Sequence, residues 1–292
     1  MSAKHPIISV TGSSGAGTTS VKRTFEQIFR REGLNAAFIE GDAYHRYDRD
    51  EMKAAMLAAE EAGNQHFSHF GVEANLLKEL EQAFRSYGEI GTARRRHYVH
   101  NQIDAEKHGV KPGTFTPWEE IPYGTDLLFY EGLHGATVTE QVNIAKYADL
   151  KIGVVPVINL EWIQKIHRDR EDRGYSTDDV MTTILRRMPD YVKYICPQFT
   201  ETDINFQRIP TVDTSNPFVA RWIPTPDESM VVIRFRSPRG IDFSYLCSMI
   251  KDSFMSRANS IVIPGSKLDL AMQLILTPMI LQLMERKRRT FF

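Results

Sequence analysis

Short apolar segments alternate along the chain with longer segments in which apolar residues recur at helical spacing. The short segments predict buried β-strands, and they lie at residues 7–10, 36–39, 127–130 and 151–158. The longer segments predict amphipathic helices, and they lie at residues 21–31, 50–62, 76–87, 159–173 and 177–188. Strands that alternate with helices in this order are typical of an α/β fold with a mainly parallel sheet.

The last third of the chain has a different pattern, with short β-rich segments on either side of a turn-rich stretch at residues 213–218. These segments, at residues 205–212 and 230–235, predict an antiparallel extension. Two further helices are expected at residues 241–250 and 268–284. The basic residues that follow them are expected to be solvated.

Glycine and proline set the expected ends of these helices. Gly33, Gly88 and Gly174 each follow a stretch with helical periodicity, where a left-handed residue commonly ends a helix. Pro189 is expected to follow the helix at 177–188, and Pro278 is expected to interrupt the last helix.

The first strand leads directly into a loop rich in glycine and hydroxyl residues, and this loop is followed by a helix. Its sequence fits the phosphate-binding template G-x-x-x-x-G-K-[ST] at Gly12, Gly17 and Thr19, whose hydroxyl would contact magnesium. Glycines let such a loop point backbone N–H groups inward, where the dipole of the next helix also favours an anion. The lysine of the template is missing, because Thr18 occupies its position. We therefore expect a phosphate cradle without its own cation.

The composition argues against several classes of protein. The 292 residues include 36 lysines and arginines and 37 aspartates and glutamates, so the net charge of −1 argues against nucleic acid as a partner. No apolar stretch approaches the roughly 20 residues of a membrane helix, and there is no signal-peptide pattern, so we expect a cytoplasmic protein without a membrane partner. Cys196 and Cys247 are too few for a disulfide framework, and we expect two buried thiols.

A second site-like segment, G-D-A-Y-H-R-Y-D-R, follows the predicted strand at 36–39. It brings Asp42, His45, Arg46 and Arg49 to the strand end, which is the edge where open α/β sheets bind ligands. A carboxylate there can take the proton of an acceptor alcohol, which makes Asp42 the preferred base. The basic neighbours indicate that the acceptor is an anion, and they favour a sugar phosphate over a neutral nucleoside.

The helices at 159–173 and 177–188 carry many arginines and are joined by a short polar turn. Because the phosphate loop lacks a lysine, positive charge has to come from elsewhere, and these helices are expected to form a lid over phosphates. A salt-bridged surface hairpin is the alternative interpretation.

Magnesium bound with a nucleotide triphosphate needs a hydroxyl and a carboxylate at a neighbouring strand end. Thr19 and Glu131 provide those groups. Asp169 could instead orient magnesium or the acceptor, so its role and that of Asp42 stay open at this point.

Six blocks of sequence, taken together and in order, resemble the bacterial branch of the phosphoribulokinases. They are G-S-S-G-A-G-T-T-S, E-G-D-A-Y-H-R-Y-D-R, H-F-S-H-F-G-V-E-A-N, L-L-F-Y-E-G-L-H-G, V-V-P-V-I-N-L-E-W-I-Q-K-I-H-R-D-R and D-T-S-N-P-F. That branch also has threonine at the lysine position of the loop. The resemblance implies an α/β fold of the P-loop nucleoside-monophosphate-kinase type, with a mixed sheet flanked by helices and an antiparallel β extension. We expect one kinase domain over 1–292, with its core at 1–200, lid helices near 159–188 and the extension at 201–292.

The resemblance also implies an activity, which is ATP-dependent phosphorylation of ribulose 5-phosphate at O1 with Mg²⁺. The products are ribulose 1,5-bisphosphate and ADP, in the reductive pentose phosphate cycle. The expected assembly is a homo-octamer.

Roles for individual residues follow from the same resemblance. The catalytic residues are expected to be Asp42, Asp169, Lys165 and Arg168, and the metal ligands Thr19, Glu131 and Asp169. The residues expected to bind ATP are Gly12, Ser13, Ser14, Gly15, Ala16, Gly17, Thr18, Thr19, Ser20, Arg173, Arg186 and Arg187. The residues expected to bind the sugar phosphate are His45, Arg49, Tyr98 and His100.

Bacterial members of the family are activated by NADH and inhibited by AMP, and the resemblance extends both effects to this chain. Arg31, Arg234 and Arg257 match positions tied to that response, although salt bridges between subunits would explain the same arginines. The regulatory cysteine pair of the plant enzymes has no counterpart, since the loop region contains no cysteine. Thioredoxin control is therefore not expected.

Two other functions fit part of the sequence. Uridine kinase shares the loop, the strand-end aspartate and an arginine-rich helix, but it would normally keep the loop lysine and lack the H-R-Y-D-R cluster. A catalytically silent P-loop binding protein would explain the missing lysine. The joint presence of Asp42, Glu131 and Asp169 argues against it.

Overall fold

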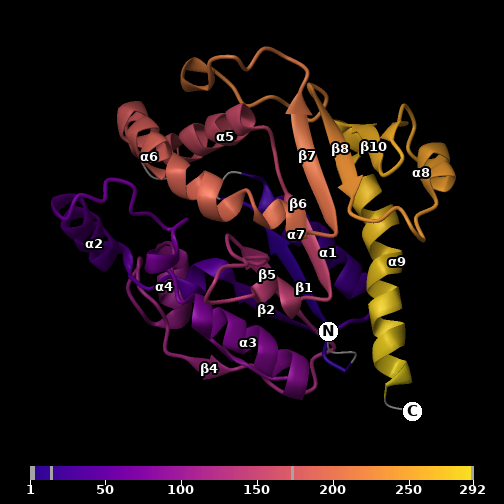
Figure 1. Ribbon diagram of the computed structural model, residues 1–292, viewed down its shortest axis with the longest axis horizontal. Helices are drawn as coiled ribbons and strands as arrows, with labels where there is room; N and C mark the ends of the chain where they lie inside the picture. The colour runs from indigo at the N-terminus through magenta and orange to yellow at the C-terminus, as the bar shows by residue number, and fades with distance from the viewer. Residues whose placement is uncertain (1–3, 14–15, 172–173, 291–292) are drawn as a thin grey trace.

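The computed structural model describes residues 4–13, 16–171 and 174–290, without the side chains of residues 19 and 20. Within these residues the centre of the fold is an eight-stranded sheet (Figure 1). Its strands, in spatial order, are β2 (Ala36–Glu40), β5 (Leu127–Gly132), β1 (Ile7–Thr11), β6 (Leu150–Val154), β7 (Ile204–Pro210), β8 (Ser229–Phe235), β10 (Ser260–Pro264) and β9 (Phe254–Arg257). The first five of these strands, β2, β5, β1, β6 and β7, run parallel to one another. The other three, β8, β10 and β9, pair antiparallel with their neighbours. The predicted mixed sheet with an antiparallel extension is confirmed.

Successive residues of the central strands pack on opposite faces of the sheet, as the pleat of a strand requires. Ile8 of β1 belongs to the core that contains α1 (Thr18–Arg31) and α9 (Leu268–Arg289), which pack against each other (Figure 1). Ile7 belongs to a second core, on α3 (Leu77–Ile90). Each central strand is buried on both faces, which explains the continuous apolar runs that predicted it.

The other elements lie in the connections between these strands. The α-helices are α2 (Arg49–Glu61), α4 (Gln102–His108), α5 (Ile158–Glu171), α6 (Thr177–Asp190), α7 (Gln198–Glu201) and α8 (Phe243–Met249). A π-helix, η4 (Tyr191–Ile195), continues α6, and β3 (Arg94–Arg95) pairs with β4 (Glu119–Glu120). The 3₁₀ turns are η1 (Gly41–Tyr44), η2 (Val72–Ala74), η3 (Ile144–Lys146), η5 (Pro217–Val219) and η6 (Gly265–Lys267).

Several predicted boundaries are wrong. Gly88 is buried inside α3, which ends instead before Gly91, where φ is 76°. Pro189 lies inside α6, and the helix continues past it as η4. Helix α9 does not end at residue 284 but continues to Arg289. In this last part, Lys287 Nζ donates to the carbonyl oxygen of Asp126 at 2.7 Å. Strands β9 and β10 were not predicted.

The structure bears on two expectations drawn from composition. Residues 265–289 form a helix long and apolar enough to cross a membrane, although its polar residues interrupt any continuous apolar run. This is weak support for a membrane span, because the apolar side of the helix is packed into the core beside α1. Cys196 and Cys247 are free thiols that are half-buried rather than buried.

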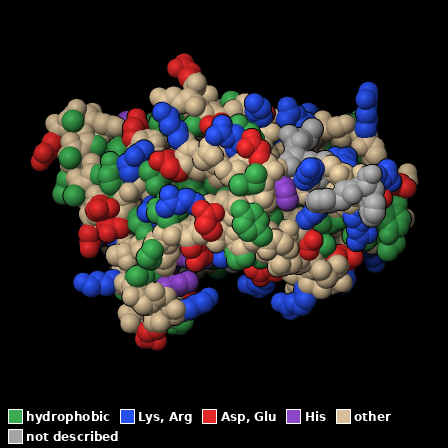
Figure 2. All heavy atoms as spheres, turned by 90° about the horizontal axis from the view of Figure 1, so that it is seen from below, with side chains coloured by type: hydrophobic (Ala, Val, Ile, Leu, Met, Phe, Trp, Pro, Cys, Tyr) green, Lys and Arg blue, Asp and Glu red, His purple; other side chains and the backbone are tan. Residues whose placement is uncertain are grey.

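The surface does not gather charge of one sign on the side seen from below. Figure 2 shows lysine and arginine side chains interspersed with aspartate and glutamate over this face. The pattern agrees with the net charge of −1.

A buried histidine holds together two connections near the carboxyl ends of the parallel strands. His134 Nε2 lies 3.2 Å from the carbonyl oxygen of His69, and Nδ1 lies 3.2 Å from Thr137 Oγ1. A carbonyl can only accept, so Nε2 donates and the neutral ring satisfies both contacts. Burial lowers the pKa of His134 to about 4.

Acidification is expected to destabilise the fold through His134. The unfolded chain takes up this proton near pH 6.5 and the folded chain only near pH 4, so stability falls as the pH is lowered between those values. The loss at pH 5 should be on the order of 2 kcal/mol. Urea unfolding at pH 7 and pH 5 measures it, and His134→Gln should lose less stability than the wild type. Equal losses in both proteins would contradict this role of His134.

Candidate active site

The predicted phosphate loop joins β1 to α1, and its geometry requires glycine at two places. Gly17 precedes α1 with a φ of 91°, a conformation that residues with a side chain rarely adopt. At Gly12 a Cβ would lie 2.9 Å from the carbonyl oxygen of Val154. The free N–H groups and the dipole at the start of α1 suit an anion such as phosphate.

Part of the predicted ATP site lies outside the described residues. This applies to Ser14, Gly15 and Arg173 and to the side chains of Thr19 and Ser20. In the described part, the Ala16 N–H donates to the carbonyl oxygen of Ser13 at 3.0 Å and closes a turn.

The residue at the lysine position of the loop binds a carboxylate instead of supplying a charge. Thr18 hydrogen-bonds to Glu131, which follows the buried part of β5. Burial raises the pKa of Glu131, and the negative charge of Asp42 acts in the same direction. Lys22, one turn along α1, forms an ion pair with Glu40 at 2.6 Å and also acts electrostatically on Glu131. Lys22 is thus a cation of the site that the sequence analysis missed.

Two glycines let the ends of β2 and β5 approach each other closely. The strand register pairs Glu40 with Glu131. Beyond that pair, a Cβ on Gly132 would lie 2.6 Å from the Cα of Gly41, and a Cβ on Gly41 would lie 2.8 Å from the Cα of Gly132. The contact brings the segment carrying Asp42 against the segment carrying Glu131.

Asp42 lies in η1, just past the end of β2, as predicted. Its Oδ1 is 3.2 Å from His45 Nε2, and its Oδ2 is 3.6 Å from His100 Nε2. Burial opposes ionisation, but the charge and hydrogen bond of His45, with the charge of His100, outweigh it and hold the pKa of Asp42 below its usual range. The side chain remains 42% exposed. Asp42 is therefore an ionised carboxylate that a ligand can reach.

The protonation of His45 follows from its partners. Asn75 Nδ2 donates to the carbonyl oxygens of His69 and Gly71, which fixes the Asn75 amide so that its Oδ1 faces His45 Nδ1 at 2.9 Å. Nδ1 is therefore a donor, and Nε2 also donates when it faces the ionised Asp42. The His45 ring is stacked on the His69 ring with centroids 4.0 Å apart. Burial lowers the pKa of His69, so the stacked partner stays neutral.

The other predicted sugar-phosphate residues lie around the same carboxylate. Arg49 Nη2 donates to the carbonyl oxygen of His100 at 2.9 Å, and its guanidinium hydrogen-bonds to Tyr98. The rings of Tyr98 and His100 meet edge to face, and Tyr98 also approaches the ring of His45. The structure thus brings His45, Arg49, Tyr98 and His100 together beside Asp42.

Arg96 holds the segment that carries Asp42. Its Nε donates to the carbonyl oxygen of Ala43 and its Nη2 to that of His45, both at 2.7 Å. The guanidinium carbon lies 3.6 Å from the ring centroid of Phe115 and 4.7 Å from that of Trp118. The sequence did not predict this role of Arg96, because its only signal there is a run of basic residues that shows neither helical nor strand periodicity.

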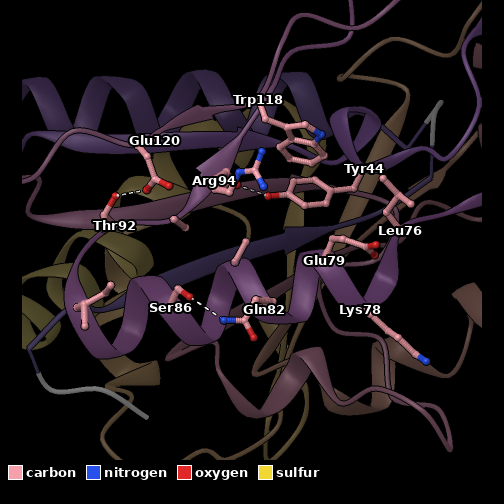
Figure 3. Close-up of a pocket in the computed structure, with 13 residues that line it drawn as sticks. Tyr44, Leu76, Lys78, Glu79, Gln82, Ser86, Thr92, Arg94, Trp118 and Glu120 are labelled. Atoms are coloured by element: carbon pink, nitrogen blue, oxygen red, sulfur yellow. Dashed lines mark hydrogen bonds between the residues drawn. The ribbon is translucent and has the colours of Figure 1, made fainter.

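A cavity of about 590 Å³ lies between α3 and the β3–β4 ribbon. Figure 3 shows Trp118, Arg94 and Tyr44 on one wall and Glu79 and Gln82 of α3 on the other. Its lining includes none of the predicted site residues. The predicted chemistry therefore lies outside this cavity.

The predicted lid residues of α5 form a compact ion cluster. Both carboxylate oxygens of the buried Asp169 are engaged, one by Lys165 and the other by Arg168 at 2.9 Å. Burial opposes ionisation of Asp169, but these two cations keep its pKa below the usual value. Burial and the charge of Arg187 lower the pKa of Lys165 to about 8. Arg187 thus joins the cluster from α6.

Helix α6 also contacts α2, which lies beside it in Figure 1. Arg186 Nη2 lies 3.2 Å from Met56 Sδ, and the carbonyl oxygen of Arg186 lies 3.2 Å from His66 Nδ1. The guanidinium of Arg187 lies 5.7 Å from the ring centroid of Phe70. Helix α6 therefore packs against the side of the molecule that carries Asp42 and α2.

The predicted effector residues lie on other elements. Arg31, at the end of α1, donates to Gln273 and to Thr277 of α9. Arg234 of β8 and Arg257 of β9 both pair with Ser260 of the strand between them, and both are exposed.

The donor set suits magnesium bound together with phosphates. No group of three or more His, Cys, Asp or Glu in the described part of the chain could hold a metal ion by itself. Magnesium usually takes one or two protein carboxylates, and the phosphates of its nucleotide and water complete its ligands. Glu131, beside the Thr18 hydroxyl and near Asp42, is a carboxylate of this kind.

Comparisons with known proteins agree with this geometry. Residues 7–215 match the Phosphoribulokinase / Uridine kinase family. The phosphoribulokinase of Nitrobacter vulgaris is 74% identical over 98% of this chain and 99% of its own, and that of Xanthobacter flavus is 72% identical over 99% of both chains. The solved structure of the phosphoribulokinase from Rhodobacter spheroides superposes with a TM-score of 0.91 at 65% identity, covering 98% of this chain and 100% of the other. The phosphate loop, the strand-end carboxylates and these whole-length similarities lead to one conclusion: the chain is a P-loop kinase of the Phosphoribulokinase / Uridine kinase family.

Proposed function

We propose that the protein transfers the γ-phosphoryl group of ATP to O1 of ribulose 5-phosphate. The products are ribulose 1,5-bisphosphate and ADP, and the reaction belongs to the reductive pentose phosphate cycle. The observation that carries the proposal is the ionised Asp42 beside His45, His100 and Arg49, next to the phosphate loop. The curated relatives named phosphoribulokinase match nearly the whole chain.

The cations around Asp42 argue for an anionic acceptor. A neutral nucleoside would leave the charge of Arg49 without a counterion at the acceptor, and such a charge is costly to desolvate. A sugar phosphate supplies that counterion. Nothing in the geometry favours uridine as the acceptor, although the family includes uridine kinases.

Asp42 is the proposed base. Its lowered pKa keeps it ionised at neutral pH, so it accepts a hydrogen bond from the acceptor hydroxyl from the start. The hydroxyl becomes acidic only as its bond to phosphorus forms, so the proton moves to Asp42 late in the transfer. The contact of His45 with Asp42 orients the carboxylate for this step.

Glu131, Thr19 and Asp169 are the proposed metal ligands. When bound, Mg²⁺ would neutralise charge on the β- and γ-phosphates. Because both oxygens of Asp169 are occupied by Lys165 and Arg168, Glu131 is the more accessible carboxylate. We propose that the cations of the Asp169 cluster stabilise charge on the transferred group, in place of the missing loop lysine.

Regulation and assembly are further proposals. We propose activation by NADH, inhibition by AMP, an octameric assembly and a cytoplasmic location. Arg234 and Arg257 both pair with Ser260, and they lie on the two strands that flank β10. The spacing of these two arginines suits the diphosphate of a dinucleotide. Their exposure also suits ion pairs between subunits.

The test of the base is Asp42→Asn, which keeps the shape of the side chain and removes its basicity. We expect kcat to fall by about 10²–10⁴-fold, with KM for ATP and for the sugar phosphate changed only several-fold. A coupled ADP-release assay measures this, and Asp50→Asn, at an exposed position on α2, is the control. If Asp42→Asn keeps more than about a tenth of the activity while Asp169→Asn abolishes it, Asp169 is the base.

The test of the acceptor compares ribulose 5-phosphate with uridine. We expect turnover with the first and negligible turnover with the second. Arg49→Ala should raise KM for ribulose 5-phosphate, because a charged hydrogen bond contributes about 1.5–3 kcal/mol. Lys53→Ala, an exposed change on the same helix, should leave KM unchanged. Similar rates with both acceptors would refute the proposed substrate.

The test of the α5 cluster separates chemistry from ATP binding. Lys165→Ala and Arg168→Ala should depress kcat more than they weaken ATP binding, because their charge is proposed to act mainly on the transition state. Steady-state kinetics and ATP titrations of each variant give the two quantities. A loss confined to ATP affinity would assign both residues to ground-state binding.

The test of regulation uses NADH at a fixed ATP concentration. We expect NADH to raise the activity of the wild type, and Arg234→Ala or Arg257→Ala to abolish this response while basal activity remains. Sedimentation of each variant shows whether the assembly is retained. Full activation in both variants would remove these arginines from the effector site.

A further inference from the structure

A buried carboxylate joins three parts of the site, and the proposed reaction does not use it. Glu161 lies in the first turn of α5 and is only 6% exposed. Its Oε1 accepts the hydrogen bond of the Ser13 hydroxyl from the phosphate loop. Its Oε2 accepts that of the Tyr191 hydroxyl, at 3.1 Å. One side chain therefore connects the loop, α5 and the start of η4.

The position is an unfavourable one for a carboxylate. Burial raises the pKa of Glu161, and the two hydroxyl donors and Lys165, one turn along α5, act against that effect. A carboxylate one hydroxyl away from a phosphate cradle also adds negative charge where a polyanion has to bind. The apolar neighbours Leu160 and Ile163 are buried on the same helix, so packing alone does not require a charge at this place.

Tyr191 lies at the point where α6 changes its geometry. Pro189 has no N–H to donate within α6, and the chain continues beyond Asp190 as a π-helix. Such π-turns are frequent at functional sites. Arg186 and Arg187 lie about one turn before Tyr191. The Tyr191 hydroxyl therefore anchors the C-terminal end of α6, the helix that carries these arginines.

We propose that Glu161 is a positioning residue that couples the phosphate loop to the arginine-bearing end of α6. Phosphate bound at the loop fixes Ser13, and Glu161 passes that constraint to Tyr191. Arg186 and Arg187 are then held more firmly in place when the loop is occupied. The same carboxylate fixes α5, so Lys165 keeps its place relative to the loop. The inference rests on the proposed function in one respect, which is that ribulose 5-phosphate is the acceptor in the activity measurements.

The first test compares Glu161→Ala with Glu161→Gln. In the glutamine variant the amide oxygen would accept from Ser13 and the NH₂ group would donate to Tyr191, so glutamine preserves the connection without the charge. We expect alanine to lower kcat by about 10- to 100-fold with a much smaller change in KM for ATP, and glutamine to restore most of the activity. Glu171→Ala, which removes a 74% exposed carboxylate from the same helix, should match the wild type.

The second test asks whether the three residues act as one unit. Ser13→Ala and Tyr191→Phe should each lower kcat, and each effect should shrink in the Glu161→Ala background, as coupling through Glu161 requires. Ser13→Ala and Tyr191→Phe each remove a single hydroxyl, so the double variant of these two residues carries the test even if Glu161→Ala fails to fold. Additive effects in these double variants would overturn the proposal.

The third test does not depend on turnover. Amide hydrogen exchange at residues 186–195 should slow when ATP and Mg²⁺ are added to the wild type or to Glu161→Gln, and much less in Glu161→Ala. Equal protection in Glu161→Ala, or none in the wild type, would overturn the coupling. The coupling would also be overturned if Glu161→Gln were as impaired as Glu161→Ala, or if the loss of activity in each variant matched its unfolded fraction. If the wild type fails to phosphorylate ribulose 5-phosphate but shows this exchange pattern, the proposed substrate fails and the coupling stands.

Discussion

The charge of the phosphates is the constraint on which the rest of the site depends. The phosphate loop has Thr18 where related loops have a lysine, so the loop provides backbone donors and a helix dipole but no full positive charge. Cations come instead from separate elements: Lys22 from α1, Arg49 from the start of α2 and Lys165 from α5. In the structure Lys22 and Lys165 are paired with carboxylates, and Arg49 contacts a carbonyl oxygen. We propose that arriving phosphates exchange partners with these cations, which are already held in place, and that this limits the cost of desolvating them.

The features predicted correctly from the sequence are those that depend on short stretches of chain. The phosphate loop is recognisable because strand, glycines and helix are contiguous, and the central parallel strands because they are buried on both faces. Asp42 and Glu131 could be assigned to one edge because the carboxyl ends of parallel strands meet there. The closeness of the two segments that carry them could be known only from the strand order, which places β5 directly beside β2. The resemblance supplied the distant Tyr98 and His100, which no local pattern indicated.

The features that were missed depend on contacts between distant segments. Arg96 donates to a carbonyl oxygen 53 residues earlier in the chain, and Glu161 accepts from a serine 148 residues earlier. In the sequence, Arg96 is one basic residue among several and Glu161 is an ordinary glutamate of a helix's first turn. Gly88 was read as a helix end because glycine favours that position, but burial inside α3 outweighed the local preference. Strand β9 is exposed along its length and shows no alternation of buried and exposed residues, so no local pattern indicates it. Strand β10 is a short buried apolar run like the strands that were predicted, and it was overlooked.

The contact between Gly41 and Gly132 has a consequence for how the site can vary. Neither residue has a side chain to bind a ligand, yet together they set the separation of the two chain segments that carry Asp42 and Glu131. An added methyl group at either position would overlap the other backbone, and the overlap could be relieved only by moving the ends of β2 and β5 apart. Because each glycine leaves room for the other's backbone, substituting both would deepen the overlap instead of compensating for it. The spacing of two carboxylates is thus specified by two positions at which any side chain, singly or as a pair, would shift the strand ends.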